Sequence, residues 1–377
     1  MLWVLFWRSS MADALLALIF QCSCLFLQRL FSRLAIVEGR RKGNSDSMAS
    51  KLRSRIQDCD CGFTDSNDPT KSFFTSFLLI NFTSITTHDL YNIFAISTYD
   101  IFPPNSPYAR SFSPDQVQLS DAGLELTVSP SPDSKKVPCA QIFTKSATLF
   151  HGSYHGQIRV NHVPGTVTGF FSYKDDKSEI DMEYLSAWDN STLQYSVKPQ
   201  VYLANDSPSS STRQLDTWNN RSVSFDKDFQ EWSFVWLPDI VHYGLDANWS
   251  KSITTNVPTA PGRISLTQWS DGDPTFSAGP PTQNSTITIS FLQAVYNDTN
   301  ASPLTCINSS TVCTITNGVL QGSKASIGHG NYSTTPPPWL VVNSAHFISP
   351  AIPGCLLVLA ILSWFNCRCS LWYSPFV

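Results

Sequence analysis

Short runs of apolar residues, separated by polar turns, recur along the middle of the chain. They are rich in β-branched and aromatic residues, as strands are, and Pro130, Pro132 and Pro138 punctuate the loop between the last two. The runs lie at 73–82, 93–96, 124–128 and 142–143. No stretch shows a sustained 3.6-residue period with caps. The pattern therefore predicts an all-β fold, a sandwich or jelly-roll of two antiparallel sheets.

One further strand, 178–184, carries an unusual row of acids. Because side chains alternate along a strand, Glu179, Asp181 and Glu183 share one face while Ile180 and Met182 point to the other. Same-face carboxylates repel each other, so a solvated strand seldom carries three in line. A glycosidase uses two carboxyl groups that differ in protonation, and a third between them helps to separate their pKa values. The residues alone leave carbohydrate chemistry, a metal site and an ordinary surface strand open.

The segments around this row resemble the core of glycoside hydrolase family 16. They are 152–160, 165–173, 178–184, 229–236, 241–246 and 263–274, within a resemblance that spans about 112–295. Family members usually have His where this chain has Gln230, but the E-x-D-x-E pattern is intact. The resemblance implies a concanavalin-A-like jelly-roll β-sandwich of the fungal secreted cell-wall type. We expect no cofactor, and no metal site, since Cys59-x-Cys61 lacks the second pair that a zinc site would need.

The same resemblance assigns roles to the acids. It implies that Glu179 is the nucleophile, that Asp181 keeps its neighbours in the right protonation states, and that Glu183 is first the general acid and then the base of a retaining mechanism. The expected substrate is a β-glucan or chitin-glucan polysaccharide of a cell wall, with hydrolysis and transglycosylation both open. The alternative is a non-catalytic, lectin-like sandwich that binds glycans, which would not need an acid triad.

Five more residues are candidates for substrate binding. They are Trp269, Asp271, Asp273, Trp188 and Tyr184. The first three occupy the place where transglycosylating branches of the family carry residues that contact the substrate, and the neighbouring Gly and Pro indicate a loop.

The amino-acid composition of the chain favours a glycan over nucleic acid as its binding partner. The chain has 377 residues, a formal net charge of −4 and no clustered basic face, which argues against nucleic acid. Its 11 Trp, 12 Tyr and 24 Phe suit a glycan binder, since sugars stack on aromatic rings. Trp232, Phe234 and Trp236 alternate at period two and are predicted to be core residues instead. We expect one folded domain, 58–327, that acts as a monomer.

Both ends of the chain look like targeting segments. Residues 1–57 combine Arg8, an apolar run at 14–27 and a polar linker, which predicts a signal peptide or a short signal anchor. A Pro/Ser/Thr-rich spacer, 328–346, precedes an apolar anchor segment and short tail, 347–377. That segment predicts a membrane helix, with the removable tail of a lipid-anchor signal as the alternative.

Glycosylation sequons and cysteines indicate the secretory pathway. The ten sequons are at Asn81, Asn190, Asn205, Asn220, Asn248, Asn284, Asn297, Asn300, Asn308 and Asn331. They predict an extracellular or cell-surface glycoprotein, anchored to the membrane at its C-terminal end. Cys306 and Cys313 are predicted to pair across a hairpin, and either Cys59 or Cys61 to pair with Cys139.

Overall fold

The computed structural model describes residues 59, 61–131, 135–188, 191–218, 225–303, 311–324 and 341–342. The chain divides after Asp58, and all the described residues belong to the second part. The predicted leader, 1–57, and the predicted anchor segment, 347–377, lie outside them, as does the spacer except for 341–342. Within the described part, no helix has the length and hydropathy that a membrane span needs.

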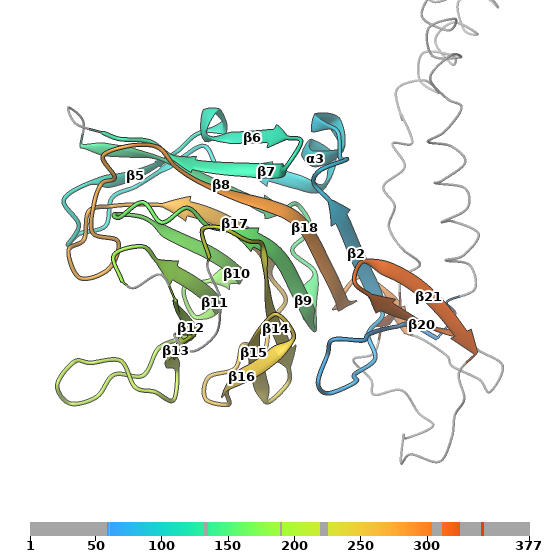
Figure 1. Ribbon diagram of the computed structural model, residues 1–377. Coiled ribbons are helices and arrows are strands. Elements are labelled where there is room, and N and C mark those ends of the chain that lie inside the picture. Colours follow the sequence, from blue (N-terminus) through green and yellow to red (C-terminus); the bar gives the residue numbers. More distant parts are fainter. Residues whose placement is uncertain are drawn as a thin grey trace, which may run out of the picture. The chain divides into compact units, whose positions relative to one another are not determined.

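Two large β-sheets, most of whose strands are labelled in Figure 1, pack face to face. The first has nine strands, with neighbours in the order β13 (Arg213–Thr217), β12 (Thr192–Lys198), β11 (Ser178–Leu185), β10 (Val167–Asp175), β17 (Arg263–Trp269), β8 (Lys136–Thr144), β5 (Ala109–Phe112) and β4 (Asp100–Ile101), while β3 (Phe94–Ile96) also pairs with β8. The second has eight, in the order β16 (Asn248–Ile253), β15 (Ile240–Leu245), β14 (Gln230–Leu237), β9 (Leu149–Arg159), β18 (Ser285–Asp298), β7 (Gly123–Val128) and β6 (Val117–Ser120), while β2 (Ser76–Asn81) pairs with β18. The predicted β-sandwich is confirmed, although β5 and β8 run parallel rather than antiparallel.

The core lies between the two sheets and follows the period of two. Ile180, Met182 and Tyr184 of β11 are buried in it, and so are Trp232, Phe234 and Trp236 of β14. The prediction that the last three are core residues is therefore confirmed. Each large apolar side chain buried in this way contributes roughly 1.5–3 kcal/mol. The acids of β11 must then lie on the opposite face of their sheet.

The predicted strands correspond to β2, β3, β7 and part of β8. The structure adds two short helical elements, α3 (Thr87–Ile93) and η1 (Pro114–Gln116). Thr86 caps α3, because its hydroxyl oxygen accepts a hydrogen bond from the backbone N–H of Asp89 at 3.1 Å. The helix buries only Leu90. A helix this short leaves no periodic pattern in the sequence, so cap chemistry was the one available signal.

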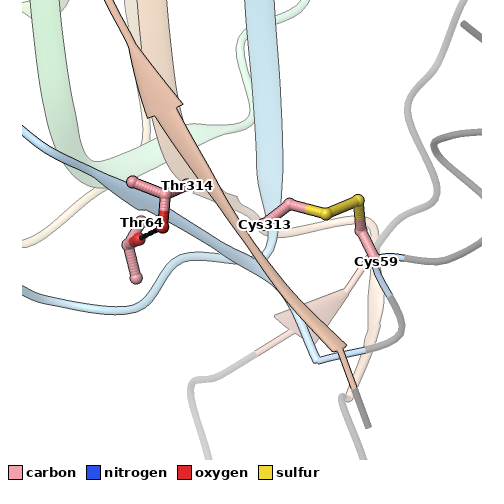
Figure 2. Close-up of a disulfide and its surroundings, with 4 residues drawn as sticks. All are labelled: Cys59, Thr64, Cys313 and Thr314. Atoms are coloured by element: carbon pink, nitrogen blue, oxygen red, sulfur yellow. Dashed lines mark hydrogen bonds between the residues drawn. A yellow bond between two sulfur atoms is a disulfide. The ribbon is translucent and has the colours of Figure 1, made fainter. Parts of the chain in front are cut away.

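A small third sheet joins distant parts of the chain. In it β1 (Phe63–Asp65) pairs in parallel with β20 (Thr311–Thr316), which also pairs with β21 (Val319–Lys324). Figure 2 shows the Thr64 and Thr314 hydroxyl groups, 3.0 Å apart, and the nearby disulfide between Cys59 and Cys313. A two-strand pair, β19 (Ser302–Pro303) with β22 (Val341–Val342), completes the described strands.

This disulfide corrects the predicted pairing of Cys313 with Cys306. The parallel register places Phe63 beside Cys313, and the backbone N–H of Cys61 donates to the carbonyl of Thr311 at 3.0 Å. Cys59, just before these residues, thereby reaches Cys313 with the Cα atoms 5.4 Å apart. Cys61 is disulfide-bonded as well. The pairing follows from long-range strand register rather than from proximity in the sequence.

Cys139 is a free thiol, so its predicted pairing with Cys59 or Cys61 is wrong. It lies on β8 in a cluster with Phe112, Val137 and Trp269, and its side chain has no exposed surface. Burial raises the pKa of the thiol to about 12. A buried thiol of this kind is inert.

Six of the ten sequons fall on described residues, and five of these, Asn81, Asn205, Asn248, Asn284 and Asn300, are exposed or half-buried. Asn297 is only 1% exposed. A bulky glycan does not fit at a buried side chain, so the fold disfavours modification of Asn297. The remaining four sequons lie outside the described residues.

Candidate active site

The three acids of β11 project from the first sheet into an open cleft of about 890 Å³. Glu179 and Asp181 are buried and Glu183 is half-buried, while the alternate residues Ile180 and Met182 face the core. The alternation predicted from the sequence therefore places all three carboxyl groups together on the cleft side.

Each acid faces a different polar residue on the neighbouring strand β12. The cross-strand pairs are Glu179 with Lys198, Asp181 with Ser196 and Glu183 with Gln194. Lys198 Nζ forms an ion pair with Glu179, Ser196 Oγ donates to Asp181 at 2.9 Å, and Gln194 Nε2 donates to Glu183 at 2.7 Å. The row thus has a cation, a hydroxyl group and an amide as its partners.

Sequence reasoning missed these three partners. The only signal was the alternation of polar residues along 194–198, which places Gln194, Ser196 and Lys198 on one face of a strand. Nothing in the sequence indicated that this face lies beside the acids. The register between two strands depends on how they pair and cannot be read from the sequence of either strand alone.

Burial and mutual repulsion raise the pKa values of the row. Burial first, and then the negative charge of Asp181, raises the pKa values of both Glu179 and Glu183 above the usual range of a carboxyl group. Lys198 acts in the opposite direction on both. Because these carboxyl groups interact, their protons belong to the row as a unit. The row consequently retains a proton near neutral pH, as general acid catalysis requires.

The amide of Gln194 is held in a fixed orientation. Arg213, on β13, donates from Nε to Gln194 Oε1 at 2.6 Å, which turns the NH₂ group of that amide toward Glu183. Since the amide donates to Glu183 Oε2, that oxygen acts as an acceptor and a proton on this carboxyl group belongs on Oε1.

Trp269 and Asp271, both predicted to bind substrate, line the cleft and hold Arg110 there. The Arg110 guanidinium lies 3.4 Å from the centroid of the Trp269 ring, and Phe276 stacks against Trp269 with the ring centroids 5.8 Å apart. Asp271 accepts from Arg110 Nη2 at 2.8 Å and Nε at 3.1 Å. With both neighbours in place, Trp269 is only 6% exposed. It supports Arg110 rather than offering an open ring face to a sugar.

The other three predicted residues have different positions. Asp273 also lines the cleft, and its Oδ1 accepts from the backbone N–H and hydroxyl of Thr275 at 2.8 and 2.7 Å. Tyr184 is 1% exposed and packs in the core against Phe225. Trp188 is half-buried and packs against the cluster that contains Cys139. Among the described residues that line the cleft, neither Tyr184 nor Trp188 appears, so neither is carried into the proposals below.

Two exposed tyrosines line the cleft instead. Tyr99, between β3 and β4, is 47% exposed, and Tyr202, in the loop after β12, is 57% exposed. Exposed aromatic rings in a cleft provide faces on which sugars stack. Both lie in connecting segments, where no periodic pattern distinguished them in the sequence.

Comparison with known proteins agrees with this geometry. The model of glycosyl hydrolases family 16 matches residues 105–291. This segment is a family 16 domain. It contains Arg110, the acid row, the partner row on β12 and Trp269, and it confirms the family predicted from the sequence.

Relatives of the family 16 domain are distant. Congo red hypersensitive protein 2 of Saccharomyces cerevisiae is 24% identical over 143 residues, which are 37% of this chain and 30% of that protein. A beta-glucanase of Paenibacillus polymyxa is 24% identical over 155 residues, which are 40% of this chain and 60% of that protein. The matched part of the chain therefore spans less than two thirds of either relative.

Among solved structures, the Bacillus licheniformis beta-glucanase has a TM-score of 0.48 and 16% identity, covering 58% of this chain and 98% of that one. The Crh5 transglycosylase has a TM-score of 0.45 and 18% identity, covering 60% and 87%.

Proposed function

We propose that this protein is a retaining glycoside hydrolase or transglycosylase that acts on β-glucan-type cell-wall polysaccharide. The observation that carries the proposal is the acid row in the cleft, with a cation at Glu179 and an oriented amide at Glu183. The membership of residues 105–291 in family 16 supports it, and the name of a matched relative, beta-glucanase, supports the choice of substrate.

In the first step, Glu179 attacks the anomeric carbon and Glu183 protonates the leaving oxygen. A bond forms between a Glu179 oxygen and the anomeric carbon as the bond to the leaving oxygen breaks, and the proton of Glu183 goes to that oxygen. The product is a glycosyl-enzyme ester with Glu183 now ionised. The raised pKa of Glu183, about 7, keeps this proton available in weakly acidic solution.

In the second step, Glu183 acts as the base. It removes a proton from a water molecule or from a hydroxyl group of a second sugar, and that oxygen attacks the anomeric carbon. The ester bond breaks and its electron pair returns to Glu179 as a carboxylate. Water gives hydrolysis and a sugar hydroxyl group gives transglycosylation, so the first step is common to both outcomes.

Asp181 assists without touching the leaving group. It is the middle and shortest member of the row, it is hydrogen-bonded to Glu179, and Ser196 donates to its Oδ2. Its negative charge raises the pKa of both neighbours. In this role Asp181 keeps the proton within the row while Glu179 becomes free to attack.

For location, the proposal is a secreted or cell-surface glycoprotein that is anchored to a membrane near its C-terminal end. The apolar segments at 14–27 and 347–365 and the exposed sequons support it. Cell fractionation with glycosidase treatment tests this part. A protein found unglycosylated in the cytosol would exclude it.

The catalytic proposal is tested by assaying purified protein on a panel of β-glucans, with and without added acceptor oligosaccharides. The wild-type protein should release or transfer sugars, and Glu179→Gln should remove this activity without lowering Tm, since the amide keeps the shape but is no nucleophile. Glu125→Gln, the same substitution on β7 of the other sheet, is the matched control and should stay active. Binding to glucan without turnover by the wild-type protein would support the lectin-like alternative instead.

A further inference from the structure

Lys198 is the last residue of β12 and lies directly opposite Glu179. Its ammonium group forms an ion pair with Glu179 Oε2, and its side chain is 36% exposed and lines the cleft. Lysine side chains are flexible, so one that is fixed beside a proposed nucleophile needs an explanation.

The charges around Glu179 explain why a cation is needed there. Asp181 and Glu183 lie on the same strand, and Tyr173 lies opposite Glu179 on β10, where its hydroxyl group donates to Asp176 at 3.1 Å. Arg263, opposite Tyr173 on β17, donates to the main-chain carbonyls of Thr144 and Lys145. Among the described neighbours of Glu179, Lys198 is the cation that contacts its carboxyl group.

Without a cation, burial and the adjacent Asp181 would both favour a protonated Glu179, which cannot attack a sugar. An opposite charge in contact favours the ionised form. Burial alone would lower the pKa of Lys198, but the charges of Asp181 and Glu179 raise it above its usual range. Lys198 thus stays charged throughout the working range of the row.

We propose, on the basis of the function proposed above, that Lys198 is a positioning residue that opposes the protonation of Glu179 and keeps its carboxyl group aimed into the cleft. The proposal extends to the intermediate. When Glu179 becomes an ester it loses its charge, and Lys198 keeps Asp181 as its anionic partner. When the ester breaks, the returning electron pair restores the Glu179 carboxylate, which again pairs with Lys198.

A positioning role for Lys198 can be distinguished from a substrate-binding role and from a structural role by the quantity that a mutation changes. A lysine that only binds substrate would affect KM and leave the pH profile of kcat unchanged. A lysine that only stabilises the fold would affect Tm. A positioning residue for the nucleophile changes kcat and moves the acidic limb of the pH profile, because that limb reports the ionisation of the nucleophile.

The test compares Lys198→Met with Lys198→Arg on barley β-glucan, or on whichever panel glucan the wild-type protein cleaves, between pH 4 and 8. We expect the acidic limb of kcat for Lys198→Met to move to higher pH, with kcat at pH 5 falling about tenfold for each unit of that shift. KM should change much less than kcat. Lys198→Arg, which keeps the charge, should restore most of the activity.

The control is Lys177→Met, which removes the same charge from the exposed turn between β10 and β11. It should retain the wild-type profile. An unchanged acidic limb in Lys198→Met, or a loss confined to KM or to Tm, overturns the inference about Lys198. A wild-type protein that cleaves no glucan, or a Glu179→Gln variant that remains fully active, overturns the proposed function instead, so the two failures are distinguishable.

Discussion

Two charged clusters, one on each sheet, contain similar residues but differ in their protonation. In the cleft, Glu179, Asp181 and Glu183 share the cation Lys198. On the second sheet, His155 of β9 lies between Asp65 and Glu231, with His155 Nδ1 3.2 Å from Glu231 Oε1 and an ion pair from Nε2 to Asp65. We call this second group the His155 cluster. Both clusters pair several acids with a single basic side chain.

The protonation behaviour of the two clusters differs. Burial lowers the pKa of His155, but the charge and hydrogen bonds of Asp65 and Glu231 outweigh it and raise that pKa to about 10. Burial likewise opposes, but does not prevent, lowered pKa values at Asp65 and Glu231. All three groups are therefore charged at neutral pH. In the cleft, by contrast, the pKa values of Glu179 and Glu183 are raised and a proton is retained.

The count of charges explains the difference. The His155 cluster has two acids for one cation, and hydroxyl groups supply further hydrogen bonds: Ser153 Oγ donates to Asp65 at 2.8 Å, and Ser233 Oγ lies 2.7 Å from His155 Nδ1. The cleft row has three acids and one cation in contact, while a second cation, Arg110, acts on Glu183 without contacting it. A cluster with a small excess of negative charge and several hydrogen bonds fixes structure, here joining β1 to β9 and β14, whereas a row with a larger excess keeps a transferable proton.

The largest expected effect tests the proposed acid and base role of Glu183. Glu183→Ala should reduce turnover of substrates with poor leaving groups by about 10²–10⁴-fold, and far less on aryl glycosides that need little protonation. Added azide should restore the aryl glycoside activity, because it attacks the intermediate without a base. Steady-state rates with and without azide measure this.

Asp181→Asn serves as the comparison for that experiment. It should depress both substrate classes and show no rescue, since Asp181 acts through its neighbours. Rescue of an Asp181 variant, with none for Glu183→Ala, would reverse the assigned roles.

The next effect is on stability, through the His155 cluster. Asp65→Asn removes the buried carboxylate that pairs with His155 and should lower the free energy of unfolding by about 3–5 kcal/mol. The remaining folded protein should keep the kcat of the wild type, because this cluster is separate from the residues that line the cleft. Denaturant unfolding together with activity measures both; Asp228→Asn, at an exposed position, is the control. If Asp65→Asn and Asp228→Asn lowered the free energy of unfolding equally, the stabilising role of the His155 cluster would be contradicted.

The pH dependence of stability should reflect the ionisation of Asp65, Glu231 and His155 in the same cluster. Asp65 and Glu231 have lowered pKa values, so their contribution is present above the pKa of the unfolded chain and is lost as the pH falls. His155 has a raised pKa, so its contribution is complete below the unfolded value, about 6.5, and is lost as the pH rises through about 10. We expect the contribution of the cluster to be greatest between about pH 5 and 6.5. A flat difference in Tm between the wild-type protein and Asp65→Asn across pH 4–10 would contradict this.

The smallest effect is on the alkaline limb of activity. In the proposed mechanism Glu183 must be protonated in the first step, and its raised pKa of about 7 means that the required form is present below this pH and is lost above it. The kcat/KM of the wild-type protein should therefore fall about tenfold per pH unit above that point. The limb should be weaker on aryl glycosides, which need less protonation. An alkaline limb near pH 4.5 would show that Glu183 is not perturbed in solution.

The sequence by itself determined what depends on a single strand. Alternation alone placed Glu179, Asp181 and Glu183 on one face of β11, and Trp232 and Trp236 in the core, because successive side chains in a strand point to opposite faces. The same local pattern, together with the family resemblance, was enough to predict the β-sandwich.

Only the tertiary structure decided which strands and residues meet. Lys198 faces Glu179 because of the register between β11 and β12, and Trp269 is covered because Arg110 reaches it from β5. Cys59 bonds to Cys313, 254 positions away, because β1 runs beside β20. The physical reason is common to all three. The alternation of side chains is a property of one segment and can be read from its residues. Register and long-range pairing depend on how distant segments pack together, and a single sequence does not show which segments meet.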